Sequence, residues 1–111
     1  MRQVRLIDPR DRILRTAVPE TRRERMRGLL GHSKMATDEA LFLERTRSVH
    51  TFGMRIPITV VLLDRDLLVR GVLPLRPRRL LLPRPGIRHV LECVEGTDLG
   101  PGDQLRIAPS G

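Results

Sequence analysis

Six consecutive residues, Ile58–Leu63, constrain the fold of this chain more than any other segment. They follow Ile56 and Pro57, and the run ends at Asp64. Successive side chains of a β-strand point to opposite faces, so the even-numbered residues of the run share one face and the odd-numbered ones the other. Both faces are largely apolar. The run therefore predicts a central strand that is covered on both sides, with proline at the strand start, where it is tolerated.

The rest of the chain predicts more short strands and one helix. Apolar or alternating runs bounded by turn residues indicate strands or extended segments at 4–7, 12–18, 49–54, 67–73, 89–94 and 104–108. Thr21 and Glu24 have the spacing of a capping box, and Gly31 is a typical helix stop. We predict an α+β, mostly β fold over a single domain, residues 1–111. Its form is a small antiparallel β-barrel or rolled sheet with one short N-terminal helix at about 21–30.

The composition limits the kinds of site that the chain can build. There are two Phe, no Trp and no Tyr, so the core must be aliphatic and no platform exists for stacking several nucleic-acid bases. Cys93 is the only cysteine, which excludes an internal disulfide and a multi-cysteine zinc site. No apolar run is long enough to span a membrane, and no apolar stretch follows the first residues as in a signal peptide. We expect no membrane span and a cytoplasmic location.

A surplus of positive charge is the main indication of a partner. The formal net charge is +8 and the sequence pI is about 11.5. Residues 65–89 carry seven Arg against one Asp, and the proline-rich segment 74–87 is predicted to be a loop. Guanidinium groups suit anionic groups such as carboxylates and phosphates. We therefore expect a protein partner or an anionic ligand, with nucleic acid as a less favoured alternative.

Few residues are candidates for chemistry, and none forms a recognised catalytic motif. His50 and Glu92 are the weak catalytic candidates, since a buried carboxyl with a raised pKa can transfer protons. Pairing of Glu92 with an arginine such as Arg88 is the favoured alternative. Cys93 lies in the same apolar strand and is expected to act as a small hydrophobic residue. Neither His89 nor His32 has ligand spacing with another histidine, so we predict no metal and no cofactor.

Several blocks of the chain, in order, resemble the family called domain of unknown function 192. They span about residues 22–106 and are Arg25–Gly31, His50–Ile58, Leu62–Asp64, Arg88–Glu92 and Gly102-Asp103. The resemblance implies a small, β-rich domain without an established activity, and an accessory role near pilus assembly or secretion. Members usually carry Asp where this chain has Thr59, and Gly where it has Leu67. An acid at that first position would suit a shared site, so Thr59 weighs against an enzyme.

The favoured hypothesis is a non-catalytic binding or accessory module. Its predicted ligand-binding residues are His50, Met54, Arg55, Arg76, Arg78, Arg79 and Arg88. The first alternative is an enzyme of unknown reaction with a site around His50 and Glu92. The second is non-specific nucleic-acid binding through the Arg-rich loop.

Overall fold

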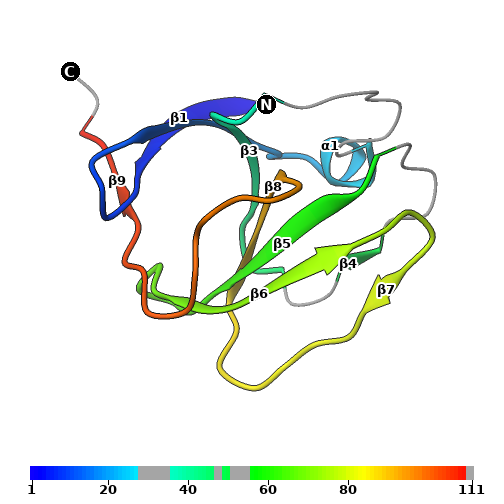
Figure 1. Cartoon of the computed structure of the whole chain (residues 1–111). Helices are drawn as coiled ribbons and strands as arrows, with labels where there is room; N and C mark the ends of the chain where they lie inside the picture. The colour runs from blue at the N-terminus through cyan, green and yellow to red at the C-terminus, as the bar shows by residue number, and fades with distance from the viewer. Residues whose placement is uncertain (28–35, 47–48, 51–55, 110–111) are drawn as a thin grey trace.

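The chain folds as a rolled, mostly β structure (Figure 1). A computed structural model describes residues 1–27, 36–46, 49–50 and 56–109. The strands are β1 (Arg2–Ile7), β2 (Ile13–Val18), β3 (Glu39–Leu43), β4 (Val49–His50), β5 (Ile58–Leu63), β6 (Val69–Leu75), β7 (Leu80–Leu81), β8 (His89–Val94) and β9 (Arg106–Ile107), and the helix is α1 (Arg22–Arg27). None of the helices in these ranges has the length and apolarity that crossing a bilayer requires.

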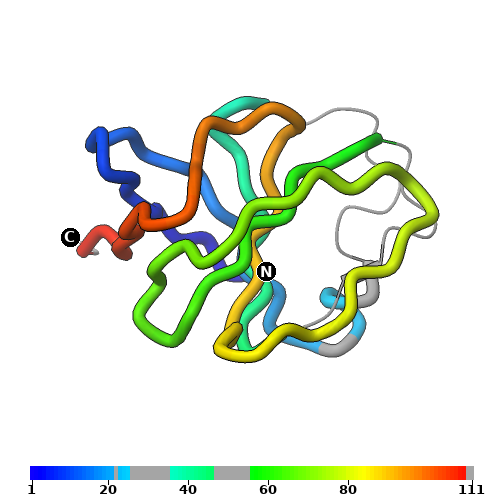
Figure 2. The backbone as a smooth tube through the Cα atoms, turned by 60° about the horizontal axis from the view of Figure 1, so that its bottom comes forward, coloured from blue at the N-terminus to red at the C-terminus, as the bar shows by residue number. Residues whose placement is uncertain are grey.

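Seven strands form one sheet in the order β6-β5-β8-β3-β2-β1-β9, and β4 pairs with β7 in a second, two-stranded sheet. Every pairing between these described strands is antiparallel except that between β2 and β3. The large sheet curls into a half-barrel (Figures 1 and 2). Where the outer strands approach, Leu68 bridges Gln104, and the Val69 N–H donates to the Asp103 carbonyl at 2.8 Å. The predicted rolled sheet is thus confirmed.

Strand β5 is an interior strand of the large sheet and is covered on both faces, as its composition predicts. It pairs with β6 on one side and β8 on the other, and all six of its residues are buried. Its two faces belong to different apolar clusters: Val61 and Leu63 pack in one, whereas Ile58, Val60 and Leu62 pack in the other. A strand that is apolar on both faces is stable only when both are covered, which explains why β5 lies inside the fold.

The first cluster, which we call the inner core, fills the concave side of the curled sheet. It joins Leu6 from β1 to Val69 from β6, although these strands lie far apart in the sheet order. The second cluster, the outer core, lies on the opposite face of β3, β5 and β8. Leu81 of β7 and Ile87 cover that face. The fold therefore has two apolar layers that share one sheet.

The predicted helix over 21–30 is not borne out at that length. The structure describes a helix over Arg22–Arg27, and residues 28–30 lie outside the described residues. The capping box itself is present: the Glu24 N–H donates to Thr21 Oγ1 at 3.1 Å, and the Glu24 carboxylate accepts from the Thr21 N–H at 3.1 Å. The cap satisfies backbone donors of the first turn, whereas short helices are marginal on their own and depend on tertiary packing.

Candidate functional site

A carboxyl group lies in the outer core. Glu92, in the middle of β8, is only 5% exposed. Its neighbours Leu91 and Cys93 belong to the inner core, so strand alternation turns Glu92 to the other face, together with Val90. Its register partners there are Leu41 on β3 and Val60 on β5, both in the outer core. Aliphatic strands therefore flank the Glu92 side chain on both sides.

The surroundings of Glu92 favour its neutral form. Burial raises the pKa of its carboxyl to about 7, because an ionised group loses its hydration in an apolar layer. Among the described residues no hydrogen bond or ion pair to its side chain is found. The expected partner Arg88 is exposed, and its N–H donates to the Leu63 carbonyl at 2.8 Å. Arg88 is therefore not the partner of Glu92: it directly precedes β8, and among the described residues it forms no ion pair with the Glu92 carboxyl. Pairing of Glu92 with an arginine elsewhere in the chain stays a prediction.

The backbone of His50 lies on the same side of the sheet as Glu92. It belongs to β4, which pairs with β7 through His50 and Leu80, and Leu81 of β7 packs in the outer core. The side chain of His50 is outside the described part of the structure, as are the candidates Met54 and Arg55, and His32. A site formed by His50 and Glu92 therefore stays a prediction.

His89 lies in a separate, polar cleft of about 790 Å³. The cleft is lined by Glu44, Arg45, Asp64, Arg65, Asp66, Gly86, Ile87, Arg88 and His89. The Nδ1 atom of His89 accepts a hydrogen bond of 2.9 Å from the Arg45 N–H, and the ring centroid is 5.2 Å from that of Phe42. Burial, reinforced by the charge of Arg88, lowers the pKa of His89. The ring is thus held neutral, with its proton on Nε2.

The described residues do not group His, Cys, Asp and Glu side chains in a way that would hold a metal ion. Cys93 is buried, and this burial, together with nearby Glu92, raises the pKa of its thiol to about 12. A thiol in that state is a poor nucleophile. The interpretation of Cys93 as a small hydrophobic residue fits its place in the inner core.

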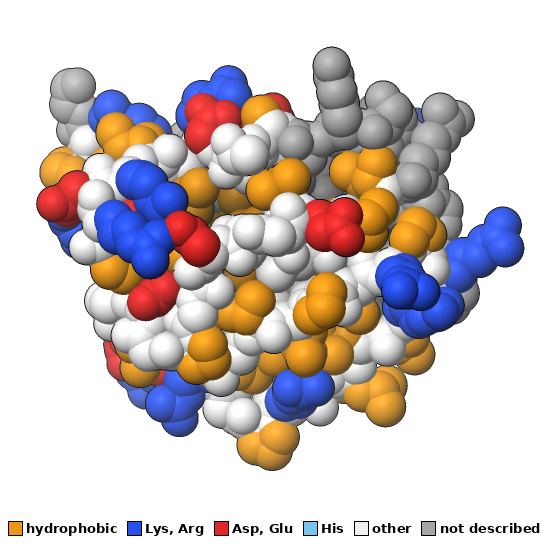
Figure 3. Space-filling view, in the orientation of Figure 1, with side chains coloured by type: hydrophobic (Ala, Val, Ile, Leu, Met, Phe, Trp, Pro, Cys, Tyr) orange, Lys and Arg blue, Asp and Glu red, His pale blue; other side chains and the backbone are white. Residues whose placement is uncertain are grey.

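The Arg-rich loop exposes apolar side chains as well as arginines, which its charge alone does not predict. Arg76, Arg78, Arg79 and Arg84 are all exposed. Between them, Leu80 and Leu82 are 58% and 66% exposed, while Leu81 is buried at 8%. Figure 3 shows arginine side chains beside apolar ones at the right of the view, over the β6–β7 connection. Alternation along an extended segment explains this: once Leu81 is anchored, both of its neighbours point outward. We call residues 76–84 the basic loop.

Comparison with known proteins identifies the family and the fold. The family model of domain of unknown function 192, described as an uncharacterized ACR, matches residues 5–107. No curated protein matches. A crystal structure of a protein of unknown function from Novosphingobium aromaticivorans is similar with a TM-score of 0.79 and 18% identity, over 94% of this chain and 83% of that one. A crystal structure from Sinorhizobium meliloti, described as a "putative transcription regulator", has a TM-score of 0.78 and 24% identity, over 95% and 92% of the two chains.

At these identities the two structures show a shared fold and carry no activity with them. The family model, in contrast, matches the amino-acid sequence itself, and the match covers most of the chain in one piece. It spans the strands of the large sheet, with β1 included from Arg5 onward. The chain therefore belongs to the domain of unknown function 192 family.

Proposed function

We propose that this protein is a binding module, acting as one domain, whose basic loop holds an acidic segment of a partner protein. The observation that carries the proposal is the exposure of Leu80 and Leu82 amid four exposed arginines. No acidic residue occurs between Asp66 and Glu92 in the sequence, so the loop has no acid of its own. Exposed leucines provide apolar contact area, and the guanidinium groups provide pairing with carboxylates. Such a surface is typical of an interface and fits no catalytic motif.

The loop is restrained, which favours a protein partner over a membrane. Pro77, Pro83 and Pro85 fix backbone φ angles along it, and β7 within it pairs with β4. A restrained loop loses little entropy on binding a defined partner. It forms no amphipathic helix and contains no aromatic residue, whereas surfaces that insert into membranes typically have both. The accessory role in pilus assembly or secretion that the family resemblance implies is a setting in which such a module would act.

The test is capture of partners from nuclease-treated lysate by four proteins: the native chain, Leu80→Ser/Leu82→Ser, Arg78→Glu/Arg84→Glu, and a matched control, Ile13→Ser. Ile13 is 47% exposed on β2, away from the loop in sequence. We expect an acidic protein that both loop variants lose and the control keeps. Equal capture by all four proteins, or binding only to anionic vesicles, would contradict the proposal.

A second candidate function is proton transfer by Glu92, favoured by the burial of this carboxyl without a described cation. The neutral acid would donate to, and the carboxylate accept from, a substrate that reaches the outer core. Its test is a screen of Glu92→Gln against the native protein for turnover of candidate substrates. A substrate consumed equally by both proteins would exclude Glu92 from that reaction.

Nucleic-acid binding is the third candidate, and the structure described as a transcription regulator gives a reason to test it. Binding through the basic loop would depend on phosphate contacts, so its affinity would fall steeply with salt. Titration with duplex and single-stranded oligonucleotides at two salt concentrations decides this. Affinity that does not change with salt would exclude it.

A further inference from the structure

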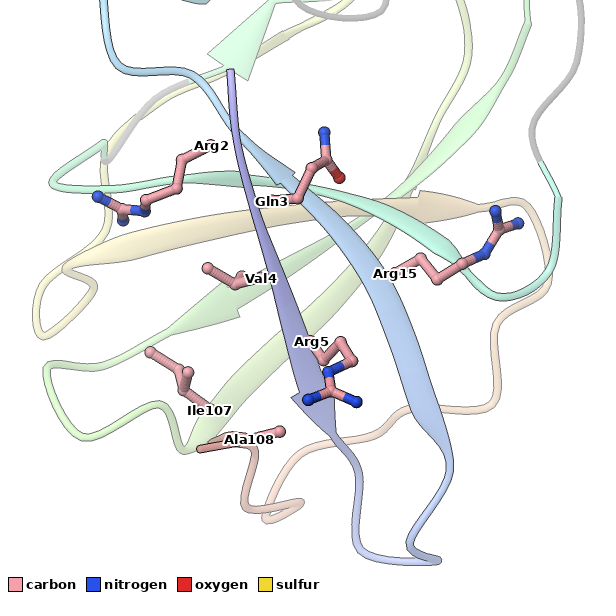
Figure 4. Close-up of a pocket in the computed structure, with 7 residues that line it drawn as sticks. All are labelled: Arg2, Gln3, Val4, Arg5, Arg15, Ile107 and Ala108. Atoms are coloured by element: carbon pink, nitrogen blue, oxygen red, sulfur yellow. The ribbon is translucent and has the colours of Figure 1, made fainter. Parts of the chain in front are cut away.

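A groove runs beside β1, at the opposite end of the large sheet from β6 (Figure 4). Its volume is about 640 Å³, and it is lined by Arg2, Gln3, Val4, Arg5, Arg15, Ile107 and Ala108. Four of these residues are consecutive in one strand. Since neighbouring strand residues point to opposite faces, a groove that four consecutive residues line must follow the edge of the strand.

The described residues cover the edge of β1 only in part. β9 pairs with Leu6 and Ile7, and one further hydrogen bond runs from the Ala108 N–H to the Arg5 carbonyl at 2.8 Å. The next described residue, Pro109, has no N–H and cannot donate to the ladder. The N–H and C=O of one residue in an antiparallel strand point to the same side, so the backbone of Gln3 faces the groove as that of Arg5 does.

The side chains around this edge are cationic and apolar. No acidic residue is among the seven that line the groove. Arg2 pairs with Glu44 at 2.8 Å, and Arg15 pairs with Asp38 at 2.8 and 3.0 Å. Arg5 has no acid partner among the described residues; its guanidinium lies 3.5 Å from the Pro109 carbonyl oxygen, a weak contact.

The pairing of β1 with β2 places a second cation beside Arg5. Arg5 stands directly opposite Arg15 on β2, and like charges in such a pair repel. Asp38 compensates Arg15, whereas the charge of Arg5 stays available for an anion. Beside it, Ile107 is 54% exposed, which gives an apolar contact next to the cation.

We propose that this edge of β1 is a docking site for an extended, acidic segment of a partner protein, which adds to the sheet as a further strand. The backbone of the segment would pair with Gln3, a carboxylate would pair with Arg5, and an apolar side chain would contact Ile107. Strand addition at a sheet edge gives affinity through main-chain hydrogen bonds and specificity through the flanking side chains. This site is separate from the basic loop and does not depend on the function proposed for that loop.

The test uses a synthetic pentapeptide of alternating glutamate and valine, titrated into the isotope-labelled protein and followed by NMR. We expect shifts for the amides of Gln3 and Arg5, and slower hydrogen exchange at the Gln3 amide by about tenfold or more. The variant Arg5→Gln should weaken binding by about tenfold, since a charge-assisted contact is lost. The control Arg70→Gln removes an exposed arginine on β6 and should bind as the native protein does. A peptide with lysine for glutamate should not bind.

A second variant separates strand addition from simple charge attraction. Gln3→Pro removes the outward N–H at an edge position, where proline is tolerated, and keeps every arginine. We expect it to weaken binding of the peptide as well. Binding that Gln3→Pro leaves unchanged, with no protection of the Gln3 amide, would overturn the proposal, as would equally tight binding of single-stranded DNA at the same residues. Retained peptide shifts at β1 in Arg78→Glu/Arg84→Glu would support it independently of the basic loop.

Discussion

Glu92 on β8 stands directly opposite Val60 on β5, and both side chains face the outer core. A carboxyl group beside a fully buried valine is an unusual pair, because the aliphatic neighbour offers no hydrogen bond and no charge. The consequence is a carboxyl pKa near 7, far above that of an exposed glutamate. The stability of the fold should therefore depend on the protonation of this single group.

We expect Glu92→Gln to stabilise the protein at alkaline pH. The pKa of Glu92 is about 7 in the folded protein against an ordinary value of 4.5, so the folded state holds the extra proton. The stabilisation that this proton gives the folded state is fully present below pH 4.5, and it is lost as pH rises to 7 and just above. At pH 8 this loss is about 3 kcal/mol. Unfolding by urea at pH 4 and pH 8 measures it: the variant should match the native protein at pH 4 and exceed it at pH 8. Parallel pH profiles would contradict this.

His89 should give the opposite pH dependence. Its pKa is lowered, so the unfolded chain binds a proton more readily than the folded one. Protonation of Nδ1 would also break the hydrogen bond from the Arg45 N–H. Stability contributed by neutral His89 is present above about pH 6.5 and lost as pH falls through the folded pKa.

The measurement is the exchange rate of the Arg45 amide between pH 7.5 and 5, corrected for intrinsic exchange. Protection should decrease on acidification. His89→Phe keeps a ring against Phe42 but removes the acceptor, so it should lose about 1 kcal/mol of stability near neutral pH and show no such change in protection with pH. A native protein whose Arg45 amide is equally protected throughout would exclude this role of His89.

The two neighbours Leu81 and Leu82 should differ sharply in their effect on stability. Leu81 is buried in the outer core, and Leu82 is 66% exposed. We expect Leu81→Ala to lower the free energy of unfolding by about 2–3 kcal/mol, and Leu82→Ala to change it by no more than about 0.5 kcal/mol. Thermal and urea unfolding check both. Equal effects would show that the basic loop is not anchored through Leu81.

Cys93 should not react with thiol reagents in the folded protein. Burial raises the pKa of its thiol to about 12, so almost no thiolate forms at neutral pH, and the side chain is only 3% exposed. The rate of labelling by a chromogenic disulfide reagent should follow global unfolding and rise with urea. Rapid labelling without denaturant would mean that the β8 strand opens locally.

The sequence predicts the parts of the fold that depend on local pattern. The burial of β5 on both faces follows from its apolar run, and the turn at Asp64 follows from the polar residues that end that run. The Thr21–Glu24 cap forms as the spacing predicts. These features depend on residues that lie close together in the chain, so periodicity and turn chemistry are enough to find them.

Other features depend on which strands become neighbours. The parallel pairing of β2 with β3 was not predicted, since the sequence indicated only antiparallel neighbours. The exposed leucines of the basic loop would have been found by applying strand alternation to 80–82. The groove at β1 had no sequence signal, because it is formed by residues from the two ends of the chain, Arg2–Arg5 and Ile107-Ala108.

The sequence by itself determined that this protein has an aliphatic core, a strand buried on both faces, a surplus of arginine and no disulfide. Each of these follows from composition or from the spacing of a few adjacent residues. Only the tertiary structure decided that Glu92 lies between aliphatic strands instead of beside Arg88, and that Arg5 faces a groove with no acid partner in the described part of the chain. The environment of a charge is set by groups distant in sequence, and a pattern of neighbouring residues does not contain it.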